Sequence, residues 1–193
     1  MPPLVKCKAQ QQLKRTTNMT STAPKTYVST YQKYQNGSLE GKWVNLDQFD
    51  NAENFIKYCR ELFNDEEEPE FMFQDWENVP DFISSESMNE RKLERLFEFL
   101  SMNESEKSII VAYVDATGNW ETDFQDIFDS YYGSADSEAE FAEEYTREHY
   151  SEAVKKLPNF IVIDWQETWN QWLQHEFYVG EDNYDEKHFF HQI

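Results

Sequence analysis

A large excess of negative charge constrains this chain more than any other feature of its sequence. Residues 1–25 hold five of the 17 basic residues and none of the 38 acids, so residues 26–193 carry a net charge of −26. Such self-repulsion destabilises a compact state, and a folded chain needs a substantial apolar core to offset it. The 15 Phe, 11 Tyr and 6 Trp can supply that core, because each buries roughly 150–250 Å². We therefore expect a folded, acidic body and a basic, disordered leader over residues 1–25.

Composition excludes several classes of protein. The two cysteines, Cys7 and Cys59, give neither a disulfide framework nor metal-ligand spacing, which favours a reducing compartment, so we expect a cytoplasmic protein. No apolar run approaches the length of a membrane span. The body lacks the clustered Lys and Arg that neutralise phosphates, which excludes direct nucleic-acid binding there.

Hydrophobic periodicity predicts an α+β fold, arranged as an elongated chain of three small domains. The first, residues 26–83, is α+β: two strands at 26–34 and 42–46 form a hairpin, a helix capped by Asp50 or Asn51 follows, and 70–76 is a third strand. The second, residues 84–124, is a small helical domain with one helix around Leu93, Leu96, Phe97 and Leu100 and another at 105–114.

The third predicted domain, residues 125–193, is α+β again. Ser137 and Glu140 form a capping-box pattern that opens a helix at 137–150, and 160–164 (FIVID) is a candidate for a buried strand. Residues 164–175 place Trp165, Trp169, Trp172 and Leu173 on one helical face. Residues 176–179 and 188–193 are expected to pair around the turn at 180–187.

Two long segments contain no Lys or Arg. Residues 61–90 hold eleven acids, and residues 108–146 hold ten. A solvated surface that only aids solubility is one interpretation, but small domains usually need a net charge of only about 2 to 8 and intersperse both signs. Two segments that carry only negative charge therefore favour a role of that charge in binding a partner.

Cation binding and catalysis are weaker interpretations of the same acids. Residues 115–126 match the ligand offsets of a calcium loop, but Trp120 occupies the position that requires glycine, so we predict no metal site. Paired carboxylates suit a hydrolase, yet with 38 acids no pair is distinctive, and no phosphate loop, nucleophile elbow or CxxC motif is present. The pair His188 and His191 is expected to be satisfied at the surface. We predict no enzyme and no cofactor.

The remaining interpretation inverts nucleic-acid recognition. A body that carries carboxylates where DNA carries phosphates would bind proteins that bind DNA. Acids at i, i+3 and i+4 of a helix lie about 5–6 Å apart. Laid out at the charge density of duplex DNA, 26 net charges match roughly 44 Å of helix, a length that a string of small domains could present.

The motifs that follow resemble a known family. Lys33, Tyr34, Gly37, Leu39, Gly41 and Trp43 form a KYxxGxLxGxW pattern, and an acidic run leads into MFQDWE at 72–77. With later segments such as DIFDSYYGSADSEAEFAEEY and LPNFIVIDWQETWNQWL, these residues resemble the ArdA antirestriction proteins over about residues 26–175. The resemblance implies a three-domain, mostly dimeric mimic of bent B-form DNA. It also implies that the protein occupies the DNA-binding groove of type I restriction–modification enzymes, the methyltransferase core with its specificity subunit.

On this interpretation, the phosphate-mimicking surface is distributed and no single acid is essential. The predicted members are Asp65, Glu66, Glu67, Glu68, Glu70, Asp75, Glu77, Asp115, Asp123, Asp126, Asp129, Glu138, Glu140, Glu143 and Glu144. We expect a homodimer through the third domain with Trp165, Trp169 and Trp172 as anchors, or alternatively that these three side chains are intradomain core. A second functional hypothesis is an acidic adaptor or chaperone for a basic DNA-binding protein.

Overall fold

The computed structural model describes residues 23–192, and these divide into two compact units. The N-terminal unit comprises residues 23–80 and 84–88, and the C-terminal unit comprises residues 81–83 and 89–192. The fold is mixed α+β, as predicted, with one small antiparallel sheet in each unit. The predicted leader lies outside the described residues except for its last three, of which Lys25 begins a strand.

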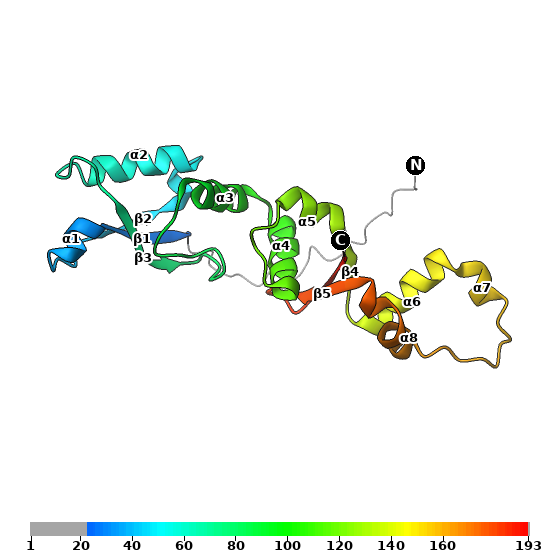
Figure 1. Ribbon diagram of the computed structural model, residues 1–193. Helices are drawn as coiled ribbons and strands as arrows, with labels where there is room; N and C mark the ends of the chain where they lie inside the picture. The colour runs from blue at the N-terminus through cyan, green and yellow to red at the C-terminus, as the bar shows by residue number, and fades with distance from the viewer. Residues whose placement is uncertain (1–22, 193) are drawn as a thin grey trace. The chain divides into compact units, whose positions relative to one another are not determined.

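The N-terminal unit is a three-stranded sheet with a helix on one face. Its order is β2-β1-β3, all antiparallel, and α2 lies over one face (Figure 1). The ring of Phe55 on α2 lies 5.8 Å from that of Phe73 on β3, which joins helix to sheet. The elements are β1 (Lys25–Thr30), α1 (Tyr31–Gln35), β2 (Lys42–Asn45), the 3₁₀ turn η2 (Leu46–Gln48), α2 (Ala52–Leu62) and β3 (Phe71–Glu77).

The predicted hairpin, helix and third strand are confirmed, but the first strand is shorter than predicted. The chain turns into α1 after Thr30, because the Thr30 side chain accepts a hydrogen bond from the Lys33 amide at 3.2 Å and caps a helix there. Asn51 caps α2 in the same way, accepting from the Asn54 amide at 2.9 Å. Cys59 is buried in α2, and burial raises the pKa of its thiol to about 12.

The C-terminal unit packs helices around a sheet of order β4-β6-β5, also antiparallel. Its helices are α3 (Glu90–Ser101), α4 (Glu104–Thr117), α5 (Phe124–Ser130), α6 (Glu138–His149), α7 (Ser151–Lys155) and α8 (Trp165–Gln171). Its strands are β4 (Tyr131–Ala135), β5 (Phe177–Glu181) and β6 (Lys187–His191), and the 3₁₀ turn η3 (Leu173–His175) precedes β5.

The predicted helical domain is not separate from the residues that follow it. Helix α4 packs against β5 so closely that a Cβ at Gly180 would lie 1.9 Å from the Ala112 carbonyl oxygen. Only glycine permits this approach without a shift of the backbone. The three-domain arrangement is therefore not confirmed, because α3 and α4 belong to the same compact unit as β4–β6.

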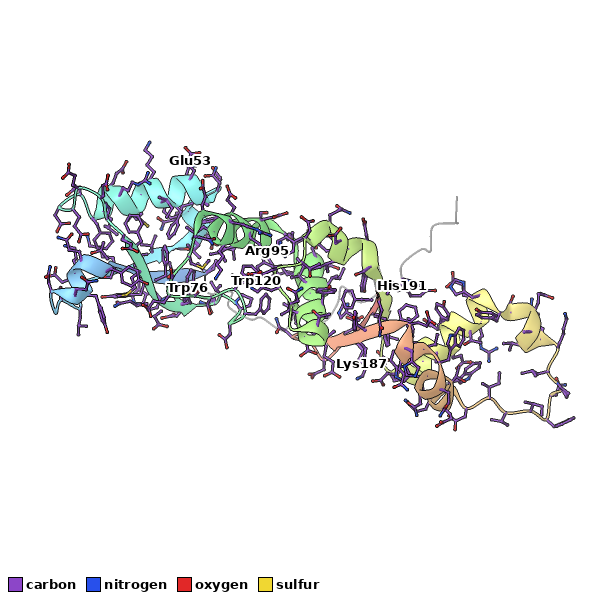
Figure 2. The ribbon with its side chains drawn as sticks, in the orientation of Figure 1. Glu53, Trp76, Arg95, Trp120, Lys187 and His191 are labelled. Atoms are coloured by element: carbon purple, nitrogen blue, oxygen red, sulfur yellow. The ribbon has the colours of Figure 1, made fainter. Side chains whose placement is uncertain are left out.

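The core of the C-terminal unit is aromatic. Helices α6 and α8 pack together, and the rings of Phe141 and Phe189 stack with centroids 3.8 Å apart. Trp169 and Leu173 are buried in the same cluster. Arg95 on α3 is partly buried, with its guanidinium beside Trp120 and its Nε donating to the Trp120 carbonyl at 2.8 Å (Figure 2).

Two sequence-based predictions in this unit are wrong. Residues 160–164 form coil rather than a buried strand, and Phe160 and Val162 are 82% and 91% exposed. The apolar run follows Pro158, whose carbonyl accepts from the Ile161 amide at 2.9 Å in a turn. His188 is not at the surface but 4% exposed on the central strand β6. No helix within residues 23–192 is long and apolar enough to cross a membrane.

Candidate acidic binding surface

The fifteen predicted surface acids lie on both units, and the structure leaves most of them accessible. Twelve are exposed, whereas Glu66, Glu138 and Glu143 are partly buried. Whether they bind a partner together stays a prediction. Their local geometry differs from element to element and decides which carboxylates point away from the protein.

In the N-terminal unit, the acidic run 65–70 is a loop that is anchored at its start. The Lys33 ammonium ion-pairs with Asp65, and this hydrogen bond holds the pKa of the Asp65 carboxyl below its ordinary value. The Thr30 hydroxyl donates to Glu66 Oε1 at 2.6 Å, and the Glu66 side chain is 4% exposed. Glu66 therefore holds the loop to β1, while Glu67, Glu68 and Glu70 extend into solvent.

The two predicted acids of β3, Asp75 and Glu77, are exposed and lie two positions apart, so they are on the same face of the strand. The Glu77 carboxylate pairs with the Lys25 ammonium on β1 at 2.9 Å, and this ion pair partly neutralises the negative charge of Glu77. The Asp75 carboxylate accepts from the Trp76 amide at 2.8 Å and keeps its exposure.

Helix α6 displays the most regular acids. Glu140, Glu144 and Glu148 follow one another at intervals of four residues and are all exposed. This spacing repeats a carboxylate about every 6 Å along the helix axis. Ser137 caps the helix and accepts from the Glu140 amide at 3.2 Å. The predicted capping box is only half formed, since the Glu140 carboxylate accepts from the Asp136 amide at 3.1 Å instead.

A second stripe of the same kind lies on α3 and was missed from the sequence. Glu90, Glu94 and Glu98 are exposed and also spaced by four residues. The first base-free run ends at Glu90, just before Arg91, so Glu94 and Glu98 lie outside it. The signal was present nevertheless, because the apolar residues of the predicted helix fix which positions face outward.

Several bases of the C-terminal unit are engaged by contacts within the protein. Lys187 pairs with Glu138 at 3.0 Å and Glu181 at 2.8 Å, and Arg147 pairs with Glu143 at 2.7 Å. Burial lowers the pKa of Arg95, which lies over the rings of Trp120 and Phe124. Helix α6 therefore keeps an excess of exposed carboxylates, whereas α3 also carries the exposed Arg91 beside its acids.

The calcium-loop candidate at 115–126 is divided among different elements. Asp115 lies on α4 and accepts from the Glu181 amide at 3.0 Å, while Asp123 caps α5 and accepts from the Gln125 amide at 2.8 Å. Gly118 ends α4 with φ 68°. Asp126 and Asp129 are exposed on helix α5, which follows Asp123.

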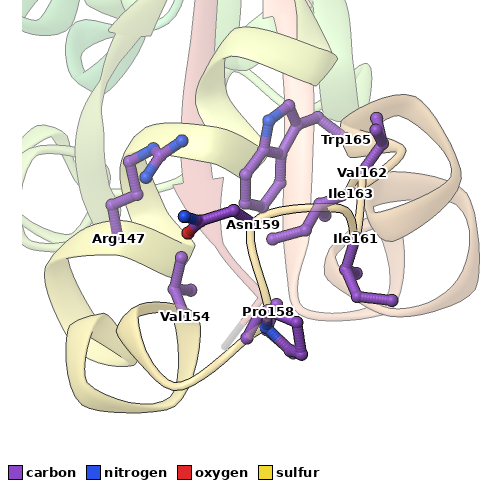
Figure 3. Close-up of a pocket in the computed structure, with 9 residues that line it drawn as sticks. Arg147, Val154, Pro158, Asn159, Ile161, Val162, Ile163 and Trp165 are labelled. Atoms are coloured by element: carbon purple, nitrogen blue, oxygen red, sulfur yellow. The ribbon is translucent and has the colours of Figure 1, made fainter.

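The three predicted tryptophan anchors occupy different environments. Trp169 is part of the intradomain core, and Trp172 packs against it. Trp165 instead lines an open hollow of about 380 Å³ together with Arg147, Val154 and the apolar coil that precedes α8 (Figure 3). The Arg147 guanidinium lies 5.4 Å from the Trp165 ring centroid.

Comparisons with known proteins agree with the resemblance that the sequence motifs indicate. A search of curated proteins finds no match. The family model described as antirestriction protein (ArdA) matches residues 26–186, which include both acidic helices and every strand except β6 and the first residue of β1. Since this match spans most of the chain, the protein belongs to the ArdA antirestriction family.

Proposed function

We propose that this protein inhibits type I restriction–modification enzymes by occupying their DNA-binding groove as a mimic of duplex DNA. The ArdA family acts on these enzymes, and its members are inhibitors that are not known as catalysts. Antirestriction activity follows from family membership. The proposal adds that the protein mimics duplex DNA and that it blocks methylation of DNA as well as cleavage.

The observation that carries the mimicry is the pair of exposed stripes on α3 and α6. Each repeats a carboxylate about every 6 Å of helix axis. Duplex DNA presents a charge about every 3.4 Å along each strand, so two or more such stripes approach the density of the phosphates. On α3, Arg95 is engaged by the Trp120 carbonyl and Arg91 is exposed, so the α6 stripe is the more strongly negative of the two.

A competition experiment tests this proposal. The purified chain is titrated against labelled duplex bound to a type I methyltransferase core, at about 50 and 200 mM salt. We expect stoichiometric displacement that weakens steeply with salt, because counterions are released from both charged surfaces. Absence of displacement at both salt concentrations would reject the mimic and favour an acidic adaptor for a basic protein.

A pair of charge-matched variants separates pattern from net charge. One variant carries Glu140→Gln, Glu144→Gln and Glu148→Gln. The control carries Glu104→Gln, Glu121→Gln and Glu152→Gln, which removes three exposed but scattered acids. If the stripe matters, the first variant displaces DNA less well than the control. Equal loss in both would mean that only total charge counts.

The homodimer is a further part of the proposal, with the coil 157–163 and Trp165 as its contact. Phe160 and Val162 are 82% and 91% exposed, which is unusual for apolar side chains that border a hollow. Light scattering of Phe160→Ser with Val162→Ser should report a monomer. Leu39→Ser, which changes an exposed apolar side chain of the N-terminal unit, should stay dimeric.

A further inference from the structure

A polar cluster lies where the turn between β5 and β6 meets the rest of the C-terminal unit. It consists of Asp182 and Glu186 in the turn and His188 on β6. One ligand atom from each of the three lies within 4.8 Å of the others. The phosphate-mimicking surface does not use this cluster, and two of its side chains are buried, Asp182 at 8% exposed and His188 at 4%.

Asp182 is held as a carboxylate. Ser108 on α4 donates to its Oδ2 at 2.6 Å, and the amides of Tyr184 and Glu186 donate to its Oδ1 at 2.8 and 3.1 Å. These three hydrogen bonds fix the orientation of the Asp182 side chain in the cluster.

His188 points an unpartnered nitrogen into the same cluster. Its Nδ1 lies 3.2 Å from the Tyr131 hydroxyl, whereas its buried Nε2 makes no hydrogen bond within residues 23–192. Asp182 Oδ2 lies 3.5 Å from Nε2 but forms no hydrogen bond with it. A buried nitrogen without a partner destabilises a fold, so such an atom in a cluster of carboxylates indicates a missing ligand.

We propose that Asp182, Glu186 and His188 bind one divalent transition-metal ion of the zinc class. An imidazole nitrogen with carboxylate oxygens suits Zn²⁺ and its neighbours, whereas Ca²⁺ and Mg²⁺ prefer oxygen alone. Bonds of about 2.1 Å in tetrahedral geometry separate ligand atoms by about 3.4 Å, close to the Asp182–His188 separation of 3.5 Å.

The surroundings of the cluster supply the outer contacts that metal ligands usually have. The Tyr131 hydroxyl can accept from His188 Nδ1–H, which leaves Nε2 free to ligate, and the Ser134 hydroxyl donates to Glu186 Oε1 at 2.5 Å. An ion here would fasten the β5–β6 turn to β4 and, through Ser108, to α4. Its role would be structural and independent of the inhibition mechanism.

Calorimetric titration of the full chain with ZnCl₂ tests the proposal, after treatment with a chelator and with millimolar Mg²⁺ present to occupy weak acidic sites. We expect one equivalent to bind and the midpoint of thermal unfolding to rise by roughly 5–10 °C at 100 times the dissociation constant. Glu186→Gln should weaken binding at least tenfold, with an unchanged circular dichroism spectrum.

Asp185→Asn is the matched control. It removes one carboxylate from the same turn, at a position with φ 60° that asparagine accommodates, without touching the three ligands. Its zinc affinity should equal that of the unchanged protein. Absence of saturable binding, full affinity in Glu186→Gln, or equal weakening in Asp185→Asn would each overturn the site.

Discussion

The two units display their acids by different physical means. In the N-terminal unit the predicted acids lie on a loop and a strand, and the loop keeps its position through Lys33 and Thr30. In the C-terminal unit the stripes lie on α3 and α6, where helix geometry itself fixes their spacing. The loop uses one of its carboxylates, Glu66, to hold itself to β1, whereas a helix can expose a whole face of carboxylates to a partner.

Both units bury polar residues beside an aromatic core. Those of the N-terminal unit are the hydroxyl residues Thr26, Ser29 and Thr30 of β1, whereas the C-terminal unit buries Asp182 and His188 together with Ser130. Buried polar groups require satisfied partners, so both units carry strict local requirements.

Truncation of the C-terminal core should have the largest effect. Phe189→Ala removes the ring stacked on Phe141 and should lower the free energy of unfolding of that unit by about 3–5 kcal/mol. Hydrogen exchange should show the loss in β4–β6 while the amides of β1–β3 keep their protection. Phe160→Ala is the control, since its exposed ring contributes little. Equal loss of protection in β1–β3 would show that the two units unfold together.

A smaller loss is expected where α4 meets β5. Gly180→Ala places a methyl group against the Ala112 carbonyl and should cost about 1–3 kcal/mol of the free energy of unfolding in urea. Gly133→Ala on β4 is matched, because a Cβ there meets nothing within 4 Å. If both substitutions proved equally mild, the close packing of α4 on β5 would be refuted.

Inhibition assays can compare the acids of the loop with those of helix α6. Three exposed carboxylates contribute about 0.6–3 kcal/mol in total, so removing them should weaken displacement of DNA roughly 3- to 100-fold. The loop variant Glu67→Gln, Glu68→Gln, Glu70→Gln should lie near the low end, because these acids follow the anchored start of the loop and lack the regular spacing of a helix. The α6 stripe variant should lie near the high end. The reverse order would place the main contact on the N-terminal unit.

The smallest effect concerns pH. Partial burial lowers the pKa of His191, whose ring lies 4.4 Å from that of Phe177. The unfolded chain then binds a proton more readily than the folded one, so the associated stability is complete above pH about 6.5 and declines as pH falls through the folded pKa. Stability of the C-terminal unit measured from pH 7.5 to 5 should decline less steeply in His191→Gln. An unchanged slope would assign the decline to other groups.

Much of the fold could be predicted from local signals. The helix capped by Asn51, the hairpin of β5 and β6, and the helices of residues 90–117 follow from periodicity and capping residues that act within a few positions. Family membership was indicated by the motif around Gly37 and Trp43 and is confirmed. The exposed faces of α6 followed from the same periodicity.

The errors arose where distant parts of the chain decide the outcome. The apolar run at 160–164 has the composition of a core strand, but sequence alone does not tell whether a neighbouring strand is available. His188 looked like a surface residue because its hydrogen-bond partner, Tyr131, is distant in the sequence and meets it only through the pairing of β4 with β6. The α3 stripe was missed because Arg91 interrupts the charge run in sequence although the acids align along the helix.

The order of strands has a consequence for how the chain is made. All strands of the N-terminal sheet are present once Glu77 has been synthesised, whereas the central strand of the C-terminal sheet is Lys187–His191. At about 5–20 residues per second, the ribosome needs roughly 5 to 20 seconds to cover that interval. Until then β4, which ends at Ala135, has no partner strand. We expect the repulsion between the many acids of the nascent chain to keep it dispersed during that interval.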